Sequence, residues 1–517
     1  MPSVPHPRRR HLVLGTVTGL VAMVVGLAVA EVVAAASTRF QSPVLDVADR
    51  VIDGVPQQVK QLAIDWFGTG DKVALLAGIG TILVVYAAAV GVVALGRRWP
   101  LALVGVALFG IAGAYASQTT RRAAPFVAVV PSVVGAVAAG VALMVLRGTV
   151  VRESEGRSIA ALTPSDRRRF IATAGATAVG AVVLGATGRM SGTRSSTAAA
   201  RRGVVLPPPS SALPAAPPTV SAGVEGVTPF FTPNADFYRI DTAITVPRVD
   251  LDEWTLTIDG MVDRPRTFTF DELLAQDLVE SDITLTCVSN GVGGKLMGTA
   301  RWLGVRLDTL LEAAGVQPDA DQVVGRSVDG YTCGFPVESL DGRDALVAIG
   351  MNGEPLPIEH GFPARLIVPG LYGYVSATKW LRQIELTRFD RFDQYWVERG
   401  WVDDAPIKVQ SRIDTPRGLA TVSPGTVAIA GVAWAQTRGI RKVEVQIDGE
   451  EWQSATLADE HNRVTWRQWS YSWNATPGRH TIAVRATEHN GPIQTGERSE
   501  PFPSGATGHH SIVVIVR

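Results

Sequence analysis

A cysteine at the end of a β-rich run is the residue of this sequence best placed to do chemistry. It lies in Thr284-Leu285-Thr286-Cys287-Val288-Ser289-Asn290-Gly291, where apolar and β-branched residues give way to a polar loop. A cysteine at the base of such a loop can offer a thiolate to a metal. A lone cysteine is more often a small buried apolar residue, so this stretch alone leaves both interpretations open. The other cysteine is Cys333, and a disulfide between the two is a further alternative.

Three further motifs accompany this cysteine. They are Thr232-Pro233-Asn234-Ala235-Asp236-Phe237-Tyr238-Arg239, the run from Met351-Asn352-Gly353-Glu354-Pro355-Leu356-Pro357 into His360-Gly361-Phe362-Pro363-Ala364-Arg365-Leu366-Ile367-Val368-Pro369-Gly370, and Ala377-Thr378-Lys379-Trp380-Leu381. Together the four motifs resemble the sulfite oxidase family, in which Leu-x-Cys-x-x-Asn supplies the one protein thiolate to molybdenum. The likeness covers about Thr228 to Arg517 and includes four motifs in one order, which is a specific signal.

The resemblance implies a molybdenum–molybdopterin cofactor and a role for each matched residue. Cys287 would bind molybdenum beside the two dithiolene sulfurs of the pterin. Arg365 and Lys379 would bind the anionic pterin phosphate, and backbone groups of residues 376–378 would cradle it. The residues expected to bind the cofactor are Asn234, Tyr238, Arg239, Cys287, Ser327, His360, Arg365, Ser376, Ala377, Thr378 and Lys379, and those expected to be catalytic are Cys287, Arg239 and Tyr238.

Several of these residues have a second interpretation. His360 could be a structural turn histidine, and Arg239 could form a surface ion pair. Asp344 could orient the pocket or be an ordinary loop carboxylate. Cys333 matches no ligand position of the family, so we expect it to be structural.

The sequence departs from the family's pattern after the cysteine. Animal and plant sulfite oxidases carry arginines there that help to bind the sulfite dianion, whereas this chain has Gly291, Val292 and Gly293. With fewer cations the pocket is less suited to a small anion. Oxidation of sulfite and reduction of sulfoxides by the same cofactor therefore both stay open.

The elements that must carry this chemistry begin with a membrane half. Four long apolar runs could each cross about 30 Å of hydrocarbon as a helix. They lie near Leu12–Ala36, Val73–Leu95, Leu101–Ala116 and Phe126–Leu146, and a fifth run, Phe170–Gly188, is richer in Ala and Gly. We expect about five transmembrane helices.

Arginine placement predicts their orientation. Positive charge accumulates in cytoplasmic loops, and the arginines gather before the first span, between the second and third, and between the fourth and fifth. Arg121 and Arg122 are a minor exception. Five spans that start inside place everything after Gly188 outside the cytoplasmic membrane. The segment Ser165–Ile171 contains Arg167-Arg168-Arg169; it resembles an internal twin-arginine signal for export of a folded domain, or it only sets orientation.

The spans contain no interior Asp, Lys or Arg of the kind expected in a redox or transport pathway, and their single acid, Glu31, lies near one end. None of the eight histidines lies inside a span, and there is no iron–sulfur cysteine set. We therefore expect the spans to act as an anchor. A separate electron-transfer partner, a cytochrome or a quinone-linked subunit, would then complete the circuit.

The predicted organisation has four parts. Residues 1–188 form the membrane domain and residues 189–227 a Pro-, Ala- and Ser-rich tether that does not order itself. Residues 228–404 mix short strands and helices, which predicts an α+β domain with a mixed sheet. Residues 405–517 read as short strands with regular turns, which predicts an immunoglobulin-like β-sandwich. This sandwich resembles the family's dimerisation domain, so a homodimer is expected.

The sequence as a whole predicts a membrane-anchored, extracytoplasmic molybdenum oxidoreductase that transfers an oxygen atom to or from a small molecule. The alternatives are a sulfoxide reductase with the same cofactor, or a cofactor-free cell-surface binding module. Zero net charge gives no indication of a nucleic-acid partner. No GxGxxG, P-loop or GxSxG motif supports a dinucleotide, NTP or serine-hydrolase site.

Overall fold

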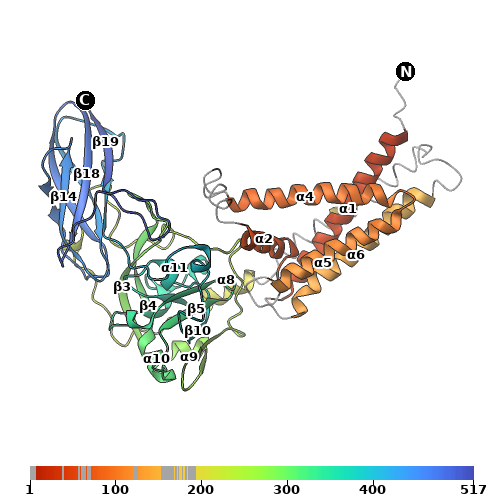
Figure 1. The fold of residues 1–517 in the computed structure, drawn as a ribbon, viewed down its shortest axis with the longest axis horizontal. Coiled ribbons are helices and arrows are strands. Elements are labelled where there is room, and N and C mark those ends of the chain that lie inside the picture. Colours follow the sequence, from red (N-terminus) through yellow and green to blue (C-terminus); the bar gives the residue numbers. More distant parts are fainter. Residues whose placement is uncertain are drawn as a thin grey trace. The chain divides into compact units, whose positions relative to one another are not determined.

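The computed structural model describes residues 7–37, 40–55, 71–119, 126–152 and 194–517, with a few isolated positions between these ranges. The chain divides into two compact units. The first consists of Met1–Ala199 with Ala243–Asp250, and the second of Ala200–Thr242 with Leu251–Arg517. Figure 1 shows the helices of the first unit and the strand-rich second unit.

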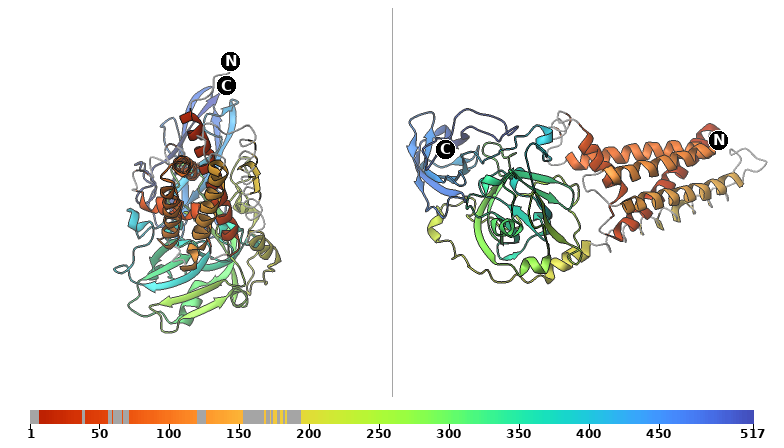
Figure 2. Two further views of the ribbon diagram at one scale, coloured as in Figure 1. Left: turned by 90° about the vertical axis from the view of Figure 1, so that its right-hand side faces the viewer. Right: turned by 60° about the horizontal axis from the view of Figure 1, so that its bottom comes forward.

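The first unit is built from long apolar helices. They are α1 (Pro7–Ala35), α4 (Asp71–Ala94), α5 (Trp99–Thr119) and α6 (Val130–Arg152), with the short α2 (Pro43–Gly54) and η2 (Phe126–Val129) beside them. The four long helices run alongside one another (Figure 2). Four segments are long and apolar enough to cross a membrane: His11–Ala35, Lys72–Ala94, Trp99–Thr119 and Phe126–Val150. The predicted apolar helices are thus confirmed for the first four runs.

Glycine allows these helices to cross closely. A Cβ atom on Gly19 of α1 would lie 1.8 Å from the carbonyl oxygen of Ala87 in α4. A Cβ on Gly91 of α4 would lie 2.0 Å from the carbonyl oxygen of Gly15. No larger residue fits at these crossings, which is a common device for packing apolar helices.

The predicted fifth span, Phe170–Gly188, and the arginine-containing stretch Ser165–Ile171 lie almost entirely outside the described residues. Both stay predictions.

The second unit contains two sheets that form the mixed α+β part. The first has the order β3 (Leu278–Thr286), β4 (Met297–Arg306), β7 (Leu346–Met351) and β8 (Glu354–Pro355), with β9 (Arg365–Ile367) also paired to β7. The second has the order β2 (Arg266–Thr269), β1 (Thr255–Gly260), β10 (Leu381–Thr387), β5 (Gln322–Ser327) and β6 (Thr332–Pro336). Because β1 and β10 are parallel and the other pairs antiparallel, the mixed sheet predicted from the sequence is confirmed.

Short helices connect these strands: α9 (Phe270–Leu274), α10 (Leu307–Ala314), α11 (Gly373–Ser376), η5 (Val337–Ser339), η6 (Ile358–His360) and η7 (Val397–Arg399). The first begins at a capping box, in which Thr269 and Glu272 each accept the other's backbone N–H. Helix α10 ends at Gly315 in the left-handed conformation, φ 71°. Beneath the first sheet, Ile283, Trp302 and Phe362 are fully buried in one apolar core.

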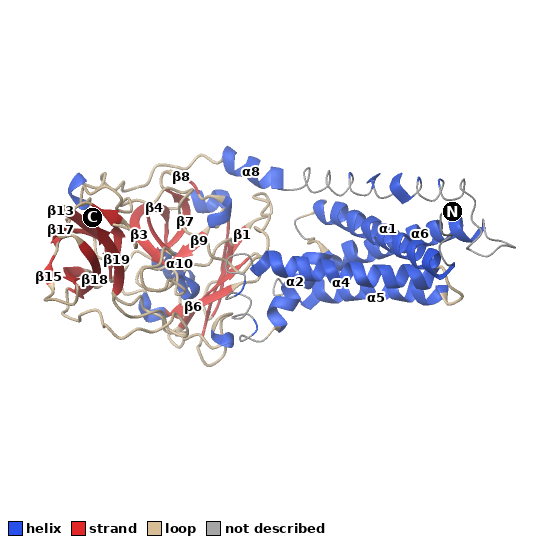
Figure 3. Ribbon diagram, turned by 90° about the horizontal axis from the view of Figure 1, so that it is seen from above, coloured by secondary structure: helices blue, strands red, loops and turns tan. Residues whose placement is uncertain are grey.

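The last part is a β-sandwich (Figure 3). One sheet has the order β11 (Gln410–Thr415), β13 (Gly425–Trp434), β17 (Arg467–Ala475) and β16 (Thr456–Leu457); the other has β12 (Thr421–Val422), β19 (His510–Val516), β18 (Gly478–Glu488), β14 (Ile440–Ile447) and β15 (Gln453–Ser454). The immunoglobulin-like architecture is confirmed. Trp434, Trp466, Trp469 and Trp473 are buried, as expected of core residues.

The prediction of an unordered tether is wrong for residues 194–227. Helix α8 (Arg194–Gly203) ends where Arg201 donates to the carbonyl oxygens of Leu356 and Pro355, at 2.7 Å each. Farther along, the backbone N–H of Ser210 donates to the carbonyl oxygen of Leu278 at 2.8 Å. The segment buries little apolar surface of its own, but hydrogen bonds to the folded unit order it instead. We call residues 200–222 the strap.

Candidate active site

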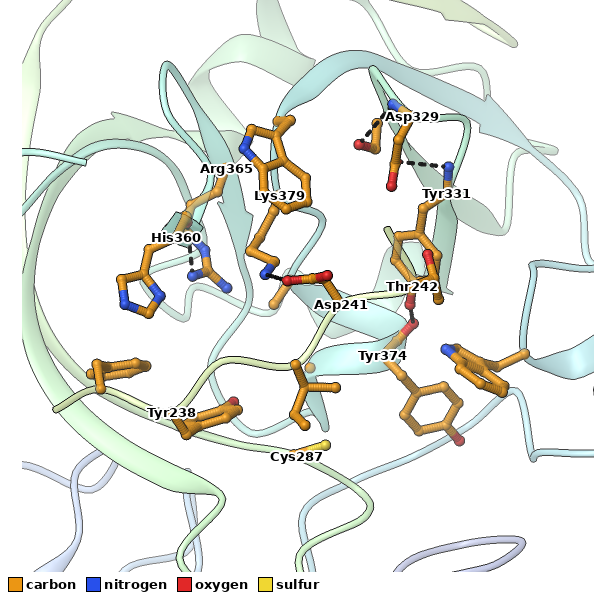
Figure 4. Close-up of a pocket in the computed structure, with 17 residues that line it drawn as sticks. Tyr238, Asp241, Thr242, Cys287, Asp329, Tyr331, His360, Arg365, Tyr374 and Lys379 are labelled. Atoms are coloured by element: carbon orange, nitrogen blue, oxygen red, sulfur yellow. Dashed lines mark hydrogen bonds and ion pairs between the residues drawn. The ribbon is translucent and has the colours of Figure 1, made fainter. Parts of the chain in front are cut away.

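A pocket in the second unit contains most of the residues that the motifs indicate (Figure 4). It encloses about 770 Å³ of empty space, including the solvent at its mouth. Its wall includes Cys287, His360, Arg365 and Lys379. These side chains come from four segments separated by up to 92 residues of sequence, so only the fold brings them together.

Cys287 directly follows β3 and is held by a compact loop. Its backbone N–H donates to the carbonyl oxygen of Leu296 at 2.9 Å, and its own carbonyl accepts from the N–H of Asn290 at 3.0 Å. The side chain of Asn290 closes the loop by accepting from the N–H of Leu296 at 2.8 Å. This explains the cysteine-x-x-asparagine spacing, because the asparagine fixes the turn that presents the thiol. Burial raises the pKa of the Cys287 thiol, which is 8% exposed.

Neither cysteine is in a disulfide. Cys333 lies on β6, fully buried, with its Sγ 2.6 Å from the hydroxyl oxygen of Thr378. Burial raises its pKa to about 11. The disulfide alternative is therefore wrong, and Cys333 has the surroundings of a structural residue.

Two cations form one wall of the pocket. Arg365 begins β9, and burial lowers the pKa of its guanidinium to about 10. Lys379 follows α11; burial lowers its pKa to about 8, although the ion pair with Asp241 at 2.9 Å opposes that shift. Figure 4 shows this ion pair crossing the pocket above Cys287 and Tyr238.

His360 is buried beside these cations, and Tyr238 is half-buried there. The ring of His360 lies 3.2 Å from the carbonyl oxygen of Asn234 through Nε2. Burial, with Arg365 and Lys379 nearby, lowers the pKa of His360 to about 4, so the ring is neutral at neutral pH. Burial raises the pKa of the Tyr238 phenol, which keeps it a hydrogen-bond donor.

The charge balance of the pocket fits an anionic cofactor. Nη1 of Arg365 donates to the carbonyl oxygen of His360 at 3.1 Å, but its buried Nε has no hydrogen-bond partner among the described residues. A buried guanidinium without an anion is costly, and a phosphate-bearing pterin would supply one. A thiol in the same pocket completes the donor set that molybdenum needs from the protein.

The structure brings seven of the predicted residues into the pocket wall: Tyr238, Cys287, Ser327, His360, Arg365, Ala377 and Lys379. The other four, Asn234, Arg239, Ser376 and Thr378, are not part of the wall. Ser376 donates to the carbonyl oxygens of Leu371 and Tyr372.

Asn234 and Thr378 support neighbouring backbone instead of facing the pocket. Asn234 donates to the carbonyl oxygen of Met351 at 3.2 Å, and Thr378 donates to that of Gly325 at 3.3 Å. Arg239 pairs with Asp241 at 2.9 Å, and its side chain is 42% exposed. This geometry is the surface ion pair that was the alternative for Arg239.

Asp344 also lies in an ion pair, with Arg306 at 2.7 Å, and is not part of the pocket wall. The wall instead contains residues that the motifs did not indicate: Ile240, Asp241, Thr242, Asp329, Tyr331, Tyr374 and Trp396. Asp241 could have been found, because it follows the Phe237-Tyr238-Arg239 motif by two positions. The tyrosines and Trp396 carried no such signal.

Comparison with known proteins agrees with this geometry. Residues 243–396 match the oxidoreductase molybdopterin binding domain, and residues 410–484 match a bacterial Ig domain. Human mitochondrial sulfite oxidase is 30% identical over 303 residues, covering 49% of this chain and 55% of the human protein. The uncharacterized oxidoreductase YuiH of Bacillus subtilis is 35% identical over 152 residues, covering 29% of this chain and 74% of that protein.

Among solved structures, the sulfane dehydrogenase SoxCD from Paracoccus pantotrophus superposes with a TM-score of 0.50 at 21% identity, over 57% of this chain and 85% of that one. This match concerns the fold alone. The chain spans about half the length of the sulfite oxidases that it matches. The matched domain implies a molybdenum–molybdopterin cofactor, and the chain belongs to the sulfite oxidase family of molybdopterin-dependent oxidoreductases.

Proposed function

We propose that this chain is a membrane-anchored molybdenum oxidoreductase that transfers an oxygen atom to or from a small molecule outside the cytoplasmic membrane. The observation that carries the proposal is one pocket that combines a buried cysteine with a buried, incompletely partnered guanidinium, Cys287 and Arg365. A cofactor-free binding module, the rival from another class, has no use for a cation buried in this way.

The residues of the pocket divide into two tasks. Cys287 would bind the metal, while Arg365, Lys379 and His360 would hold the pterin and its phosphate. Tyr238, with its raised pKa, would donate a hydrogen bond without losing its proton. When bound, the cofactor supplies a two-electron centre that accepts or gives up an oxygen atom.

The arginine distribution and the four apolar helices support anchoring with the catalytic unit outside. Among the described spans, none contains a histidine within its apolar core, since His11 stands at the first residue of its span. An internal haem is therefore not expected there. Electrons would pass to or from a separate cytochrome or quinone-linked partner.

The pocket lining also favours one class of substrate. Asp241 neutralises Lys379, Asp329 adds a second carboxylate, and Tyr331, Tyr374 and Trp396 add aromatic surface. In this wall the two carboxylates offset the two cations, so little charge is left to bind a small dianion, and the aromatic surface suits an uncharged organic molecule. Reduction of an organic sulfoxide is accordingly the second candidate function.

Assay of the purified, cofactor-loaded chain in both directions tests these proposals. Sulfite oxidation would be followed with an artificial electron acceptor and sulfoxide reduction with a reduced viologen dye. We expect turnover in at least one assay, with the sulfoxide faster. Sulfite turnover far above sulfoxide turnover would overturn the second candidate, and loaded protein inactive in both assays would contradict oxygen-atom transfer.

A further inference from the structure

The strand that carries the cysteine is an edge strand. Strand β3 pairs with β4 on one side only, so its opposite side presents backbone groups that need other partners. The strap occupies the first part of this open side, where Ser211 forms a parallel bridge with Val279. The remaining part runs from Asp282 to Thr286 and leads directly to Cys287.

Loops of the β-sandwich supply the partners for that last part. Strand β3 is the member of its sheet nearest the sandwich (Figure 3). The side chain of Asn462 donates to the carbonyl oxygen of Asp282 at 3.0 Å. The N–H of Thr284 donates to the carbonyl oxygen of Val464 at 3.1 Å, and its hydroxyl accepts from the N–H of Trp466 at 2.8 Å. The sandwich thus extends the sheet at the strand that carries the cysteine.

Gln436 makes the sandwich contact nearest to the cysteine. It follows β13, is fully buried, and donates through Nε2 to the carbonyl oxygen of Thr284 and to the hydroxyl oxygen of Thr286, at 3.2 Å each. Its Oε1 is buried and has no partner among the described residues. An amide with one unsatisfied oxygen is a poor source of stability. The two donor bonds, one of them to the residue before Cys287, point to a positioning task.

The sandwich also contacts the loop after the cysteine. Nη1 of Arg412 donates to the carbonyl oxygen of Gly294 at 2.8 Å. Gly293 has φ 76°, and a Cβ there would lie 2.3 Å from the ring of His510. The segment that carries Cys287 is therefore held from the sandwich on both sides of the cysteine in sequence.

We propose that the β-sandwich is part of the active-site scaffold and that Gln436 is a positioning residue that sets the direction of the Cys287 sulfur. This inference rests on the proposed role of Cys287 as the molybdenum ligand. Gln436 touches neither the metal nor the substrate. It acts through Thr284 and Thr286, whose positions determine where β3 delivers the thiolate.

The test compares two buried glutamines of the sandwich. Gln436→Leu removes both donor bonds to β3. Gln494→Leu is the matched control, because Gln494 is 3% exposed and the described partners of its side chain, Ser411, Ala486 and Gly508, all lie within the sandwich. Both variants are purified with cofactor beside the natural chain. Molybdenum content, the Mo(V) electron paramagnetic resonance spectrum and amide hydrogen exchange of residues 282–288 are measured.

We expect Gln436→Leu to retain molybdenum but to shift the Mo(V) spectrum and to speed amide exchange at residues 282–288 about tenfold, the factor that one ordinary hydrogen bond represents. Gln494→Leu should change neither, even if its unfolding midpoint falls equally. Thr286→Val removes one acceptor of Gln436 and keeps the shape of the side chain. If Gln436→Leu does not fold, the same measurements on Thr286→Val test the positioning role. An unchanged spectrum and unchanged exchange in the folded variant would overturn the positioning role. A natural chain that binds no molybdenum would instead contradict the proposed function, and the inference with it.

Discussion

At the residue scale, the pocket is organised around a buried charge that the protein alone does not balance. Lys379 has Asp241, but the partners of Arg365 among the described residues are one carbonyl oxygen and the face of Trp302, 5.2 Å from its ring centroid. A group of this kind lowers the stability of the empty domain and raises its affinity for an anion. Replacing Arg365 by an uncharged residue should therefore raise the stability of the cofactor-free domain and weaken its binding of the cofactor.

Arg365→Met tests this opposition. In protein made without cofactor, we expect the variant to be as stable as the natural chain or about 1–3 kcal/mol more stable, because a buried charge is removed. In protein made with cofactor, we expect about 10- to 100-fold weaker retention, the loss typical of charge-assisted bonds to a phosphate. Chemical denaturation and molybdenum content after gel filtration measure the two effects. Arg306→Met, which removes a partly exposed ion-paired arginine, should leave retention unchanged; equal loss in both variants would refute the assignment.

At the element scale, the sequence predicted the strands that have clear periodicity. It did not predict the ordered conformation of the strap, which depends on hydrogen bonds between residues far apart in sequence. The short strands expected within residues 405–517 are present, among them β13 and β18, because apolar residues alternate along much of their length. The strap was expected to be unordered, since prolines and serines give no local sign of order. Its order comes from hydrogen bonds to Leu278 and from Arg301, which donates to the carbonyl oxygens of Leu213 and Pro214. No local pattern encodes such contacts.

The strap should stabilise the second unit measurably. We compare a chain beginning at Ala200 with one beginning at Gly223, both exported without the apolar helices. The longer chain should have the higher urea midpoint, because removing the strap leaves the carbonyl oxygen of Leu278 and the guanidinium of Arg301 without their strap partners. Urea denaturation monitored by tryptophan fluorescence gives the difference. Equal midpoints for the two chains would mean that the strap only rests on the surface.

A half-buried histidine on β19, His510, gives the sandwich a pH dependence with a definite sign. Nδ1 of His510 accepts from the N–H of Ile413 at 3.0 Å; burial lowers its pKa from 6.5 to about 4, with Arg412 and Arg498 adding to the shift and Asp414 opposing it. Between these values the unfolded chain binds more protons than the folded one. The contribution of His510 to stability is therefore fully present above pH 6.5 and is lost as the pH falls towards 4.

We expect this loss of stability to reach about 3 kcal/mol. The variant His510→Gln should abolish the loss, because the glutamine side chain can still accept from the N–H of Ile413 but does not titrate. The measurement is the unfolding free energy of both chains at pH 7.5 and at pH 4.5. The natural chain should lose more stability between these pH values than the variant. Parallel losses would show that other groups govern the acid sensitivity.

At the scale of the whole molecule, the two units differ in how much their sequences reveal. Uncharged runs identify apolar helices directly, because no soluble core requires such length. Four motifs identified the family, but only seven of the eleven predicted cofactor residues line the pocket, and the other four lie outside its wall. Sequence motifs identify residues that a family uses together, whereas the direction in which each side chain points depends on packing. The roles of Tyr331, Tyr374 and Trp396 in the wall could be seen only once β5, α11 and η7 were in place.

The order of assembly and export is the main prediction at this scale. If a folded, cofactor-loaded domain crosses the membrane at the internal arginines, replacing Arg167 and Arg168 by Lys should keep the second unit in the cytoplasm. Protease digestion of intact spheroplasts measures this directly. As a control, replacing Arg97 and Arg98 by Lys preserves charge at a different loop and should not alter the location. Normal external display after the Arg167 and Arg168 changes would show that these arginines only set orientation.

The proposed chemistry depends most on the bond between Cys287 and molybdenum, and X-ray absorption at the molybdenum edge examines that bond itself. The natural chain should contain about one molybdenum, with sulfur neighbours from the dithiolene and from one cysteine. Cys287→Ser should stay folded, lose one sulfur neighbour and lose turnover, whereas Cys333→Ser should keep both the spectrum and the activity. Sulfur coordination that is unchanged in Cys287→Ser, or lost in Cys333→Ser, would contradict the assignment on which the site and the function are built.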